Sequence, residues 1–208
     1  MVNNNKKNFL VDIGNASSQQ LAAFDCGVKN INIFLTEKAK KDSDENICGT
    51  QLIISPGSKT RILAFYSLSA AKIEAQIKNT VDNLHLFKEY EQFAVDNPDA
   101  QIYDPNNERY IFPVISLDFL AVDKSIQKKG LGSLLLQLVF KKALSMRESG
   151  LGFMGIKTEA LYDAKDFYSS RLFKYIDENP DNVQANFCPK TCPMLARIDD
   201  IKETISNL

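Results

Sequence analysis

The segment from Val122 to Ser133 has the residue types and spacing with the clearest chemical meaning in this chain of 208 residues. Gln127 follows Val122 after four intervening residues, and Gly130 and Gly132 then precede a long apolar-periodic stretch. Glycine lets the backbone turn tightly and approach a ligand closely. A helix that starts at such a turn directs N–H groups and a partial positive charge toward phosphate oxygens. The segment therefore predicts a phosphate-binding turn, and a pyrophosphate suits it best.

The charges around this turn favour the same ligand. The stretch from Lys124 to Arg147 contains six basic residues and no acidic residue. The basic residues are Lys124, Lys128, Lys129, Lys141, Lys142 and Arg147. The turn differs from a P-loop, which ends in Gly-Lys-Ser or Gly-Lys-Thr, and from the dinucleotide fingerprint, which needs a third glycine at a fixed offset.

A strand before the turn and a helix after it must hold the turn in place. Val114 to Val122 is an almost continuous apolar run, which is typical of a strand buried on both faces of a sheet. Asp123 to Lys129 is expected to be the turn itself. A helix is expected from Leu131 to Met146, with its end near Ser149 and Gly150. Its apolar face should consist of Leu131, Leu134, Leu135, Leu138, Val139 and Met146.

The N-terminal part of the chain predicts helices followed by a hairpin. Two short helices are expected within Leu21 to Ala39, with a break at Asp25 and Gly27. The charged stretch Lys40 to Glu45 is expected to be a solvated loop. The hairpin strands are predicted at Gln51 to Ile54 and at Arg61 to Ser69, around a Ser-Pro-Gly-Ser turn.

Beyond the central helix the sequence predicts a strand, a helix and two further strands. These are Phe153 to Thr158, Asp163 to Arg171, Leu172 to Ile176 and Met194 to Ile198. The element order indicates a mixed α/β sheet (α+β), and the length suits a single domain over residues 1–208. The acidic stretch Asp82 to Arg109 is interpreted as a solvated insertion at about 82–110, with a helical first half from Leu84 to Val95.

Composition narrows the classes of protein. A net charge of −1 supplies no general basic field for nucleic acid, so RNA binding would need a local basic patch. The polar N-terminus and the lack of a long apolar run predict neither a signal peptide nor a membrane span, and therefore a cytoplasmic protein. No metal site is expected. Buried or idle thiols are predicted at Cys26, Cys48, Cys188 and Cys192, and an incidental histidine at His85.

Two phrases of the sequence together resemble the cofactor motifs of the GNAT superfamily of acetyltransferases. Val122-x4-Gln127-x2-Gly130-x-Gly132 looks like the coenzyme A signature, and Leu120-Ala121-Val122-Asp123 is similar to the central strand before it. Ala164-Lys165-Asp166-Phe167-Tyr168 resembles the second cofactor motif. The resemblance covers about Val114 to Ile176. It implies a GNAT-like central sheet of about six to seven strands, flanked by helices and splayed at the central strand. It also implies transfer of the acetyl group of acetyl-CoA to a primary amine.

The same resemblance implies roles for individual residues. Backbone groups of Leu120 and Val122 would hold the pantetheine arm like an added strand, and a backbone N–H near Val122 would polarise the thioester carbonyl. Tyr168 would be the general acid for the leaving thiolate, with a packing tyrosine beside Phe167 as the alternative. The implied cofactor-binding residues are Leu120, Ala121, Val122, Gln127, Lys128, Lys129, Gly130, Leu131, Gly132, Ser133, Ala164 and Phe167.

The general base stays open. Glu159, Glu74 and Asp118 are candidates, but each suits an ordinary surface or strand-end acid, and a water relay needs no base residue at all. Ser67 and Ser69 are candidates for lining the substrate side.

A narrower resemblance points to the GNAT subfamily that includes toxins of toxin–antitoxin pairs, some of which acetylate aminoacyl-tRNA. The matching phrases are Phe24-Asp25-Cys26-Gly27, Phe34-Leu35, Phe65-Tyr66-Ser67-Leu68-Ser69 and Thr191-x-Pro193-Met194. The chain departs from the family pattern in several features. These are the acidic insertion, the lack of an overall basic balance, Leu172 in place of the usual glycine and Leu161 in place of a frequent asparagine.

The acceptor therefore stays open between aminoacyl-tRNA, a protein lysine or N-terminus, and a small amine. A catalytically silent coenzyme A-binding module that regulates a partner is the alternative from another class. The implied partners are coenzyme A, tRNA and an antitoxin, with a homodimer as a further alternative and no membrane.

Overall fold

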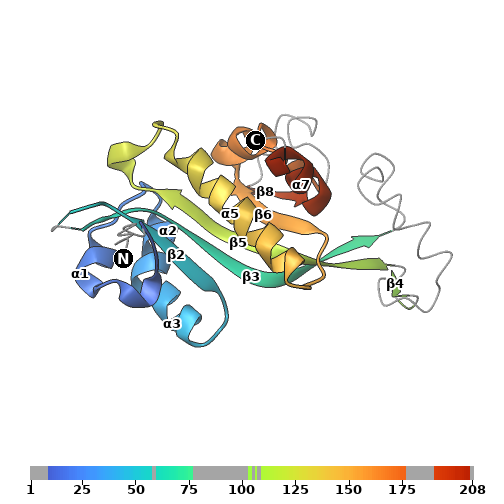
Figure 1. Ribbon diagram of the computed structural model, residues 1–208, viewed down its shortest axis with the longest axis horizontal. Coiled ribbons are helices and arrows are strands. Elements are labelled where there is room, and N and C mark those ends of the chain that lie inside the picture. The colour runs from blue at the N-terminus through green and yellow to red at the C-terminus, as the bar shows by residue number, and fades with distance from the viewer. Residues whose placement is uncertain are drawn as a thin grey trace, which may run out of the picture. The chain divides into compact units, whose positions relative to one another are not determined.

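The computed structural model describes residues 9–57, 60–76, 103–104, 106, 109–176 and 190–206. Helices and one eight-stranded sheet make up the fold, which confirms the mixed α/β class and the GNAT-like architecture (Figure 1). The chain forms two compact units: unit 1 contains Met1–Ser69 and Leu117–Lys142, and unit 2 contains Ala70–Ser116 and Ala143–Leu208.

Unit 1 contains the N-terminal helices, the predicted hairpin and the predicted turn. Its strands follow the order β1-β2-β3-β5. The elements that lie in it or begin in it are β1 (Leu10–Asp12), η1 (Ile13–Asn15), α1 (Ser18–Ala22), α2 (Lys29–Ile33), η2 (Phe34–Lys38), α3 (Ala39–Asp44), β2 (Gly49–Ile54), β3 (Ile62–Gln76), η5 (Lys124–Ile126) and α5 (Leu131–Glu148). β2 pairs with β3 in antiparallel register, with Gln51 opposite Tyr66, so the hairpin is confirmed.

The predicted break between two helices is confirmed at residues 23–28, which we call the connector. α1 begins at a capping box in which the Ser17 hydroxyl accepts from the Gln20 N–H and Gln20 Oε1 accepts from the Ser17 N–H. The connector passes through Gly27, whose φ of 86° favours glycine.

The predicted loop from Lys40 to Glu45 is wrong, because the helical backbone continues. α2 runs through a π-helical segment, Phe34–Lys38, into α3, Ala39–Asp44. Ala39, the first residue of α3, is fully buried. The charged side chains of the segment face solvent, and Lys41 pairs with Glu45 at 3.7 Å. A charged run on the solvent side of a helix gives no apolar period, which is why the sequence pattern missed it.

Aromatic side chains form the centre of the unit 1 core. The Phe34 ring stacks on Phe119 at 3.8 Å between centroids, and the Phe24 ring meets Phe65 edge-on at 5.4 Å. Phe24, Phe34 and Phe65 belong to the toxin-like phrases. Their burial shows that these phrases build the core that holds the connector.

Unit 2 contains the second half of the sheet. Its strands follow the order β3-β5-β6-β8-β7, and β4 pairs with β5. The elements that lie in it or begin in it are β4 (Tyr103–Asp104), β5 (Arg109–Val122), β6 (Gly155–Leu161), η6 (Tyr162–Ala164), α6 (Lys165–Ser169), β7 (Lys174–Tyr175), β8 (Thr191–Arg197) and α7 (Ile198–Ser206). The predicted last strand is confirmed as β8, but Ile198 begins α7, a helix that the sequence prediction lacked.

The helix after the turn is confirmed, but its predicted apolar face is partly wrong. α5 ends at Glu148, before Gly150 with a φ of 98°. Leu135 and Val139 are buried as predicted, whereas Leu134 is 50% exposed. The buried side chains are Leu135, Leu136, Val139, Phe140 and Ala143. The buried face of α5 is therefore rotated by about one residue from the predicted apolar face. Nearly every early position of α5 is apolar, so the pattern alone fits several rotations of the helix.

Several predictions fall on residues outside the described ranges. These include Cys188, His85 and most of the acidic insertion at 82–110, including the Leu84 to Val95 helix. The prediction of buried thiols is confirmed for Cys26, Cys48 and Cys192. Burial raises the pKa of the Cys26 and Cys48 thiols, which favours their unreactive neutral form. Within the described part of the chain, no helix has both the length and the apolar character needed to cross a membrane.

Candidate functional site

The turn after β5 has the backbone shape that its glycines predicted. Gly130 has a φ of 84°, in the left-handed region that glycine adopts at little cost, and Lys128 has a φ of 59°. The Leu134 N–H donates to the Gly130 carbonyl at 3.1 Å, so the helical hydrogen-bonding pattern of α5 starts at Gly130. Leu131 and Gly132 therefore occupy the first turn of the helix, where N–H groups lack intrahelical acceptors. This is the arrangement that an anion needs.

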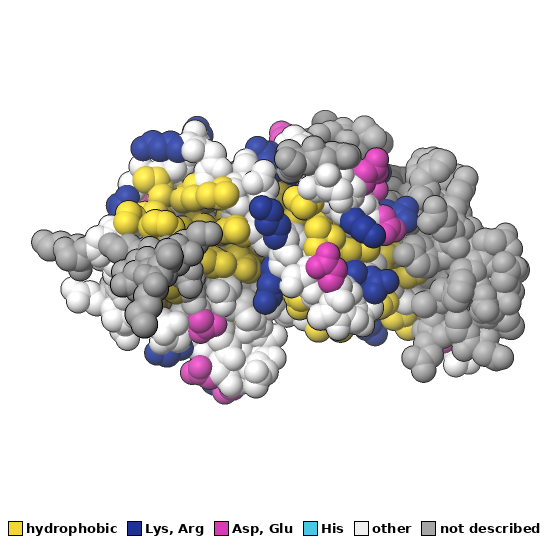
Figure 2. Space-filling model, viewed as in Figure 1, with side chains coloured by type: hydrophobic (Ala, Val, Ile, Leu, Met, Phe, Trp, Pro, Cys, Tyr) yellow, Lys and Arg dark blue, Asp and Glu magenta, His cyan; other side chains and the backbone are white. Residues whose placement is uncertain are grey.

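The charge around the start of α5 also suits an anion. The first turn of α5 contains no acidic residue, and Lys128 and Lys129 are exposed next to Gly130. On the face seen in Figure 2, Lys and Arg side chains are interspersed with Asp and Glu. The exposed Lys128 and Lys129 give the turn itself a local excess of positive charge.

Asp123 caps the start of the turn. Its Oδ1 accepts from the Ser125 N–H at 3.0 Å and from the Ser125 hydroxyl at 2.5 Å. The Asp123 N–H donates to the Leu63 carbonyl at 2.9 Å, which continues the pairing with β3 past the end of β5. The turn thus leaves the sheet at a fixed point.

The Gln127 side chain braces the turn. Its Nε2 donates to the Val122 carbonyl and to the Cys26 carbonyl, both at 2.9 Å. One amide group therefore joins the end of β5, the turn and the connector. Because this donor is already engaged, the side chain acts as a brace in this structure, and only its backbone remains to meet a phosphate.

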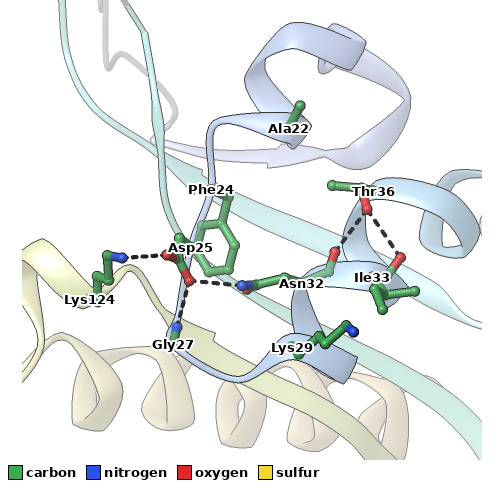
Figure 3. Close-up of a pocket in the computed structure, with 9 residues that line it drawn as sticks. All are labelled: Ala22, Phe24, Asp25, Gly27, Lys29, Asn32, Ile33, Thr36 and Lys124. Atoms are coloured by element: carbon green, nitrogen blue, oxygen red, sulfur yellow. Dashed lines mark hydrogen bonds and ion pairs between the residues drawn. The ribbon is translucent and has the colours of Figure 1, made fainter.

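A second link joins the connector to the turn through Asp25 (Figure 3). Asp25 Oδ1 accepts from the Gly27 N–H and from Asn32 Nδ2, both at 2.8 Å, and Asp25 Oδ2 lies 2.5 Å from Lys124 Nζ. The Lys124 N–H donates to the Asp25 carbonyl at 2.8 Å. Lys124, followed by the Gly27 N–H and Asn32, lowers the pKa of Asp25 to about 2. The hydrogen bond to Asp25 raises the pKa of Lys124, so both groups stay charged near neutral pH.

A cavity of about 570 Å³ lies beside this network (Figure 3). Its lining combines apolar carbon with amide, hydroxyl, carboxylate and ammonium groups. The lining residues are Ala22, Phe24, Asp25, Gly27, Lys29, Asn32, Ile33, Thr36 and Lys124. Lys29 and Asn32 were missed at the sequence level, although the Phe24-Asp25-Cys26-Gly27 phrase marks the segment that leads to them.

The residues predicted to hold the pantetheine arm lie at the end of β5. Ala121 is buried in the core of unit 1, and Leu120 and Val122 are half-buried. Side chains alternate along a strand, so Leu120 and Val122 point away from the face that Ala121 occupies. Their backbone role stays a prediction.

Tyr168 lies on α6 in unit 2 and is only 7% exposed. Its ring meets Phe167 edge-on at 5.1 Å and Phe173 edge-on at 5.2 Å. Burial raises the pKa of Tyr168 to about 12, against the opposing effect of a hydrogen bond with the Thr158 side chain. The phenol is therefore protonated at neutral pH, which a general acid requires.

The other predicted residues of the second motif flank Tyr168. Ala164 occupies the N-cap position of α6, and Phe167 is half-buried under the Arg171 guanidinium, whose carbon lies 4.2 Å from the ring centroid. Leu172, where the family pattern has glycine, has a φ of 70°. The backbone at this position is thus in the left-handed conformation that glycine adopts at little cost, although the residue here is leucine.

Each of the three candidate bases lies on a strand of the sheet. Glu159 pairs with Lys157 at 3.1 Å and Glu74 pairs with Lys72 at 2.7 Å, while Asp118 is exposed on β5. Ser67 is fully buried, with its hydroxyl 2.7 Å from that of Thr50, so its place is in the core.

The structure thus gathers the predicted residues into two groups. The turn, the end of β5 and the connector are joined within unit 1. Ala164, Phe167 and Tyr168 are joined within unit 2.

No protein-family model matches the chain. Several solved structures resemble it over nearly its whole length. A mutant of KacT has a TM-score of 0.70 and 24% identity, over 94% of this chain and 97% of that one. A tyrosine-to-phenylalanine mutant of the AtaT toxin has a TM-score of 0.69 and 18% identity, over 94% and 92% of the two chains. AtaT complexed with acetyl-methionyl-tRNAfMet has a TM-score of 0.67 and 18% identity, over 94% and 98%. The chain has the GNAT-like fold that it shares with these toxins.

Proposed function

We propose that this protein is an acetyl-CoA-dependent N-acetyltransferase of the toxin type, with the amino group of an aminoacyl-tRNA as the acceptor to test first. One observation carries the proposal: the turn before α5 combines a left-handed backbone at Lys128 and Gly130, a helix start and a local basic charge. Similar folds include AtaTR bound with AcCoA and AtaT complexed with acetyl-methionyl-tRNAfMet. These structures support the choice of cofactor and acceptor.

The residues of this chain fit coenzyme A. The first-turn N–H groups of α5 and the exposed Lys128 and Lys129 would bind the pyrophosphate. The backbone of Leu120 and Val122 would hold the pantetheine arm by main-chain hydrogen bonds. The remaining proposed contacts are with Ala121, Gln127, Gly130, Leu131, Gly132, Ser133, Ala164 and Phe167.

Bound acetyl-CoA supplies the acetyl group as an activated thioester. Tyr168 would donate its phenolic proton to the sulfur that leaves, and with a pKa of about 12 the phenol is protonated near neutral pH. A tyrosine-to-phenylalanine change has been made in the similar AtaT toxin, and the corresponding test here is Tyr168→Phe.

The same proposal covers the localisation, the domain organisation and the partners of the protein. We place the protein in the cytoplasm as a single domain over residues 1–208, with an antitoxin as a protein partner and a homodimer as its assembly. AtaT has been solved bound to the C-terminus of the antitoxin AtaR, which supports the choice of an antitoxin partner.

A catalytically silent coenzyme A-binding module is the second candidate. It is favoured by the burial of Tyr168 between Phe167 and Phe173, which a tyrosine with only a packing role would also show.

The deciding experiment is an acetyl-transfer screen with thiol release as the readout. Charged tRNA, peptides and small amines serve as acceptors for the wild type and Tyr168→Phe, and calorimetry measures coenzyme A binding. We expect transfer by the wild type and a loss of about 10² or more in kcat for Tyr168→Phe, with coenzyme A binding retained. Coenzyme A binding without transfer to any acceptor would establish the silent module instead.

A further inference from the structure

Asn32 lies on α2, and its side chain reaches back to the connector, where it contacts Asp25 (Figure 3). Its Nδ2 donates to Asp25 Oδ1 at 2.8 Å. Its Oδ1 accepts from the Cys26 N–H at 3.0 Å and from the Cys26 thiol at 3.1 Å. The Asn32 N–H donates to the Val28 carbonyl at 3.1 Å, so the helix holds the backbone of this residue while its side chain holds the connector.

The two ends of the Asn32 amide cannot be exchanged. If the amide were turned over, Nδ2 would face the Cys26 N–H, donor against donor, and Oδ1 would face the Asp25 carboxylate, acceptor against acceptor. Aspartate at this position could not donate to Asp25, and alanine could neither donate nor accept. The position therefore requires a short side chain that accepts in one direction and donates in the other, which asparagine provides.

The two residues that Asn32 holds are also the two through which the connector holds the proposed pyrophosphate turn. The Cys26 carbonyl accepts from Gln127 Nε2 at 2.9 Å, and Asp25 Oδ2 pairs with Lys124 Nζ. All of these residues belong to unit 1. One amide group thus orients both of the connector residues that meet the turn.

We propose that Asn32 is a positioning residue for the coenzyme A turn, and that it acts by fixing the connector against which residues 124–130 are held. This inference rests on the proposed function, which assigns the turn to the pyrophosphate. Backbone N–H groups bind an anion well only when they are held in the right place, so a turn with a loosened support binds it more weakly. The rate of acetyl transfer from bound cofactor should change little, because the Asn32 side chain bonds to the connector and not to Tyr168.

Cofactor affinity and steady-state kinetics give the first test. We expect Asn32→Ala to raise the calorimetric Kd for coenzyme A and KM for acetyl-CoA about fivefold, with kcat within about twofold of the wild type. Asn32→Asp keeps the acceptor but sets a second carboxylate against Asp25, so it should raise Kd at least as much. Asn30→Ala, at an exposed position of the same helix, is the matched control and should leave Kd unchanged. An unchanged Kd in Asn32→Ala would overturn the inference.

A double-mutant cycle with Gln127→Ala locates the effect. Asn32 and Gln127 both bond to Cys26, so their losses of coenzyme A affinity should not be independent. If each single substitution raises Kd about fivefold, the pair should remain well below the product of about 25-fold. Losses that multiply in full would show that Asn32 does not act through the connector.

Amide hydrogen exchange tests the positioning role in the absence of coenzyme A. The Lys124 N–H donates to the Asp25 carbonyl at 2.8 Å, and the Ile54 N–H, in the same unit, donates to the Phe9 carbonyl at 2.9 Å. In Asn32→Ala the Lys124 amide should exchange about fivefold faster, with the Ile54 amide unchanged. Equal acceleration at both amides would mean a general loss of stability and would refute the positioning role. Failure of the proposed function is distinguishable, since the wild type would then bind no coenzyme A while the Lys124 amide still responded to Asn32→Ala.

Discussion

Lys124 Nζ lies 2.5 Å from Asp25 Oδ2, and this ion pair joins the connector between α1 and α2 to the first residue of η5. The same carboxylate accepts hydrogen bonds from the Gly27 N–H and from Asn32. Asp25 is therefore the centre of a network that links the N-terminal helices to the proposed pyrophosphate turn (Figure 3).

Asp25→Asn should destabilise the protein at neutral pH and change its response to acid. The pKa of Asp25 is lowered to about 2, from 3.8, so its ionised form stabilises the folded state above pH 3.8. That contribution is lost as the pH falls through 2. In urea unfolding, the wild type should exceed Asp25→Asn in stability at pH 7, and the gap should shrink below pH 4. A gap that is constant with pH would show that the charge has no role. Asp44→Asn, at an exposed position of α3, is the control.

Gly130→Ala should lower the affinity for coenzyme A by more than it lowers the stability of the fold. The φ of 84° makes any side chain cost about 1 kcal/mol at this position. A Cβ there meets no protein atom within 4 Å, so the folded protein has room for it and the loss of affinity would come from its effect on the proposed phosphate site. Calorimetry should show a loss of about 2 kcal/mol in coenzyme A affinity, the value of roughly two hydrogen bonds.

Gly150→Ala is the matched control for this substitution. Gly150 also has a positive φ, 98°, and also has open space around its Cβ position, but it lies at the other end of α5. Both variants should lose similar stability, and only Gly130→Ala should lose affinity. Equal affinities in the two variants would mean that the pyrophosphate site has been misplaced.

Gln127→Ala should raise KM for acetyl-CoA several-fold with little change in kcat. The substitution removes the hydrogen bonds to Val122 and Cys26 that hold the turn against the connector, and each is worth about 1 kcal/mol or less. Gln127→Glu should not rescue the effect, because a carboxylate cannot donate to a carbonyl. Gln137→Ala, at an exposed position of α5, controls for loss of an amide side chain. A changed kcat with an unchanged KM would contradict the bracing role.

Leu172→Gly should be more stable than Leu172→Ala by about 1 kcal/mol, which reverses the usual order of the two residues. The reason is the φ of 70° at Leu172, which costs alanine as much as leucine and costs glycine almost nothing. Thermal melting of the two variants measures the difference directly. If Leu172→Ala is the more stable variant, the left-handed backbone at this position is not retained in solution.

The local features of the site could be predicted from the sequence. The apolar run of β5, the glycines after it and the periodic apolar residues of α5 each act over a few neighbouring positions, so their pattern indicates strand, turn and helix directly. The left-handed backbone at Gly130 follows from the same local logic. The motif around Tyr168 was found in the same way, through a short phrase that resembles a family motif.

The relationships between distant segments could not be predicted. Gln127 and Cys26 are 101 residues apart, and Asp25 and Asp123 are 98 residues apart. The sequence contains these donors and acceptors among many equivalent ones. The buried face of α5 and the helical course of residues 39–44 were mispredicted for a related reason, since apolar pattern alone fits more than one rotation and charged runs suit both loops and exposed helix faces.

The sequence by itself therefore determined a strand, a turn and a helix start with the charge that an anion needs. Only the tertiary structure decided which groups hold that turn, and that the Tyr168 ring is buried against Phe167 and Phe173. The physical reason is that backbone conformation depends on side chains a few positions away. Hydrogen-bond partners and burial depend instead on which distant elements the packing of the whole core brings together.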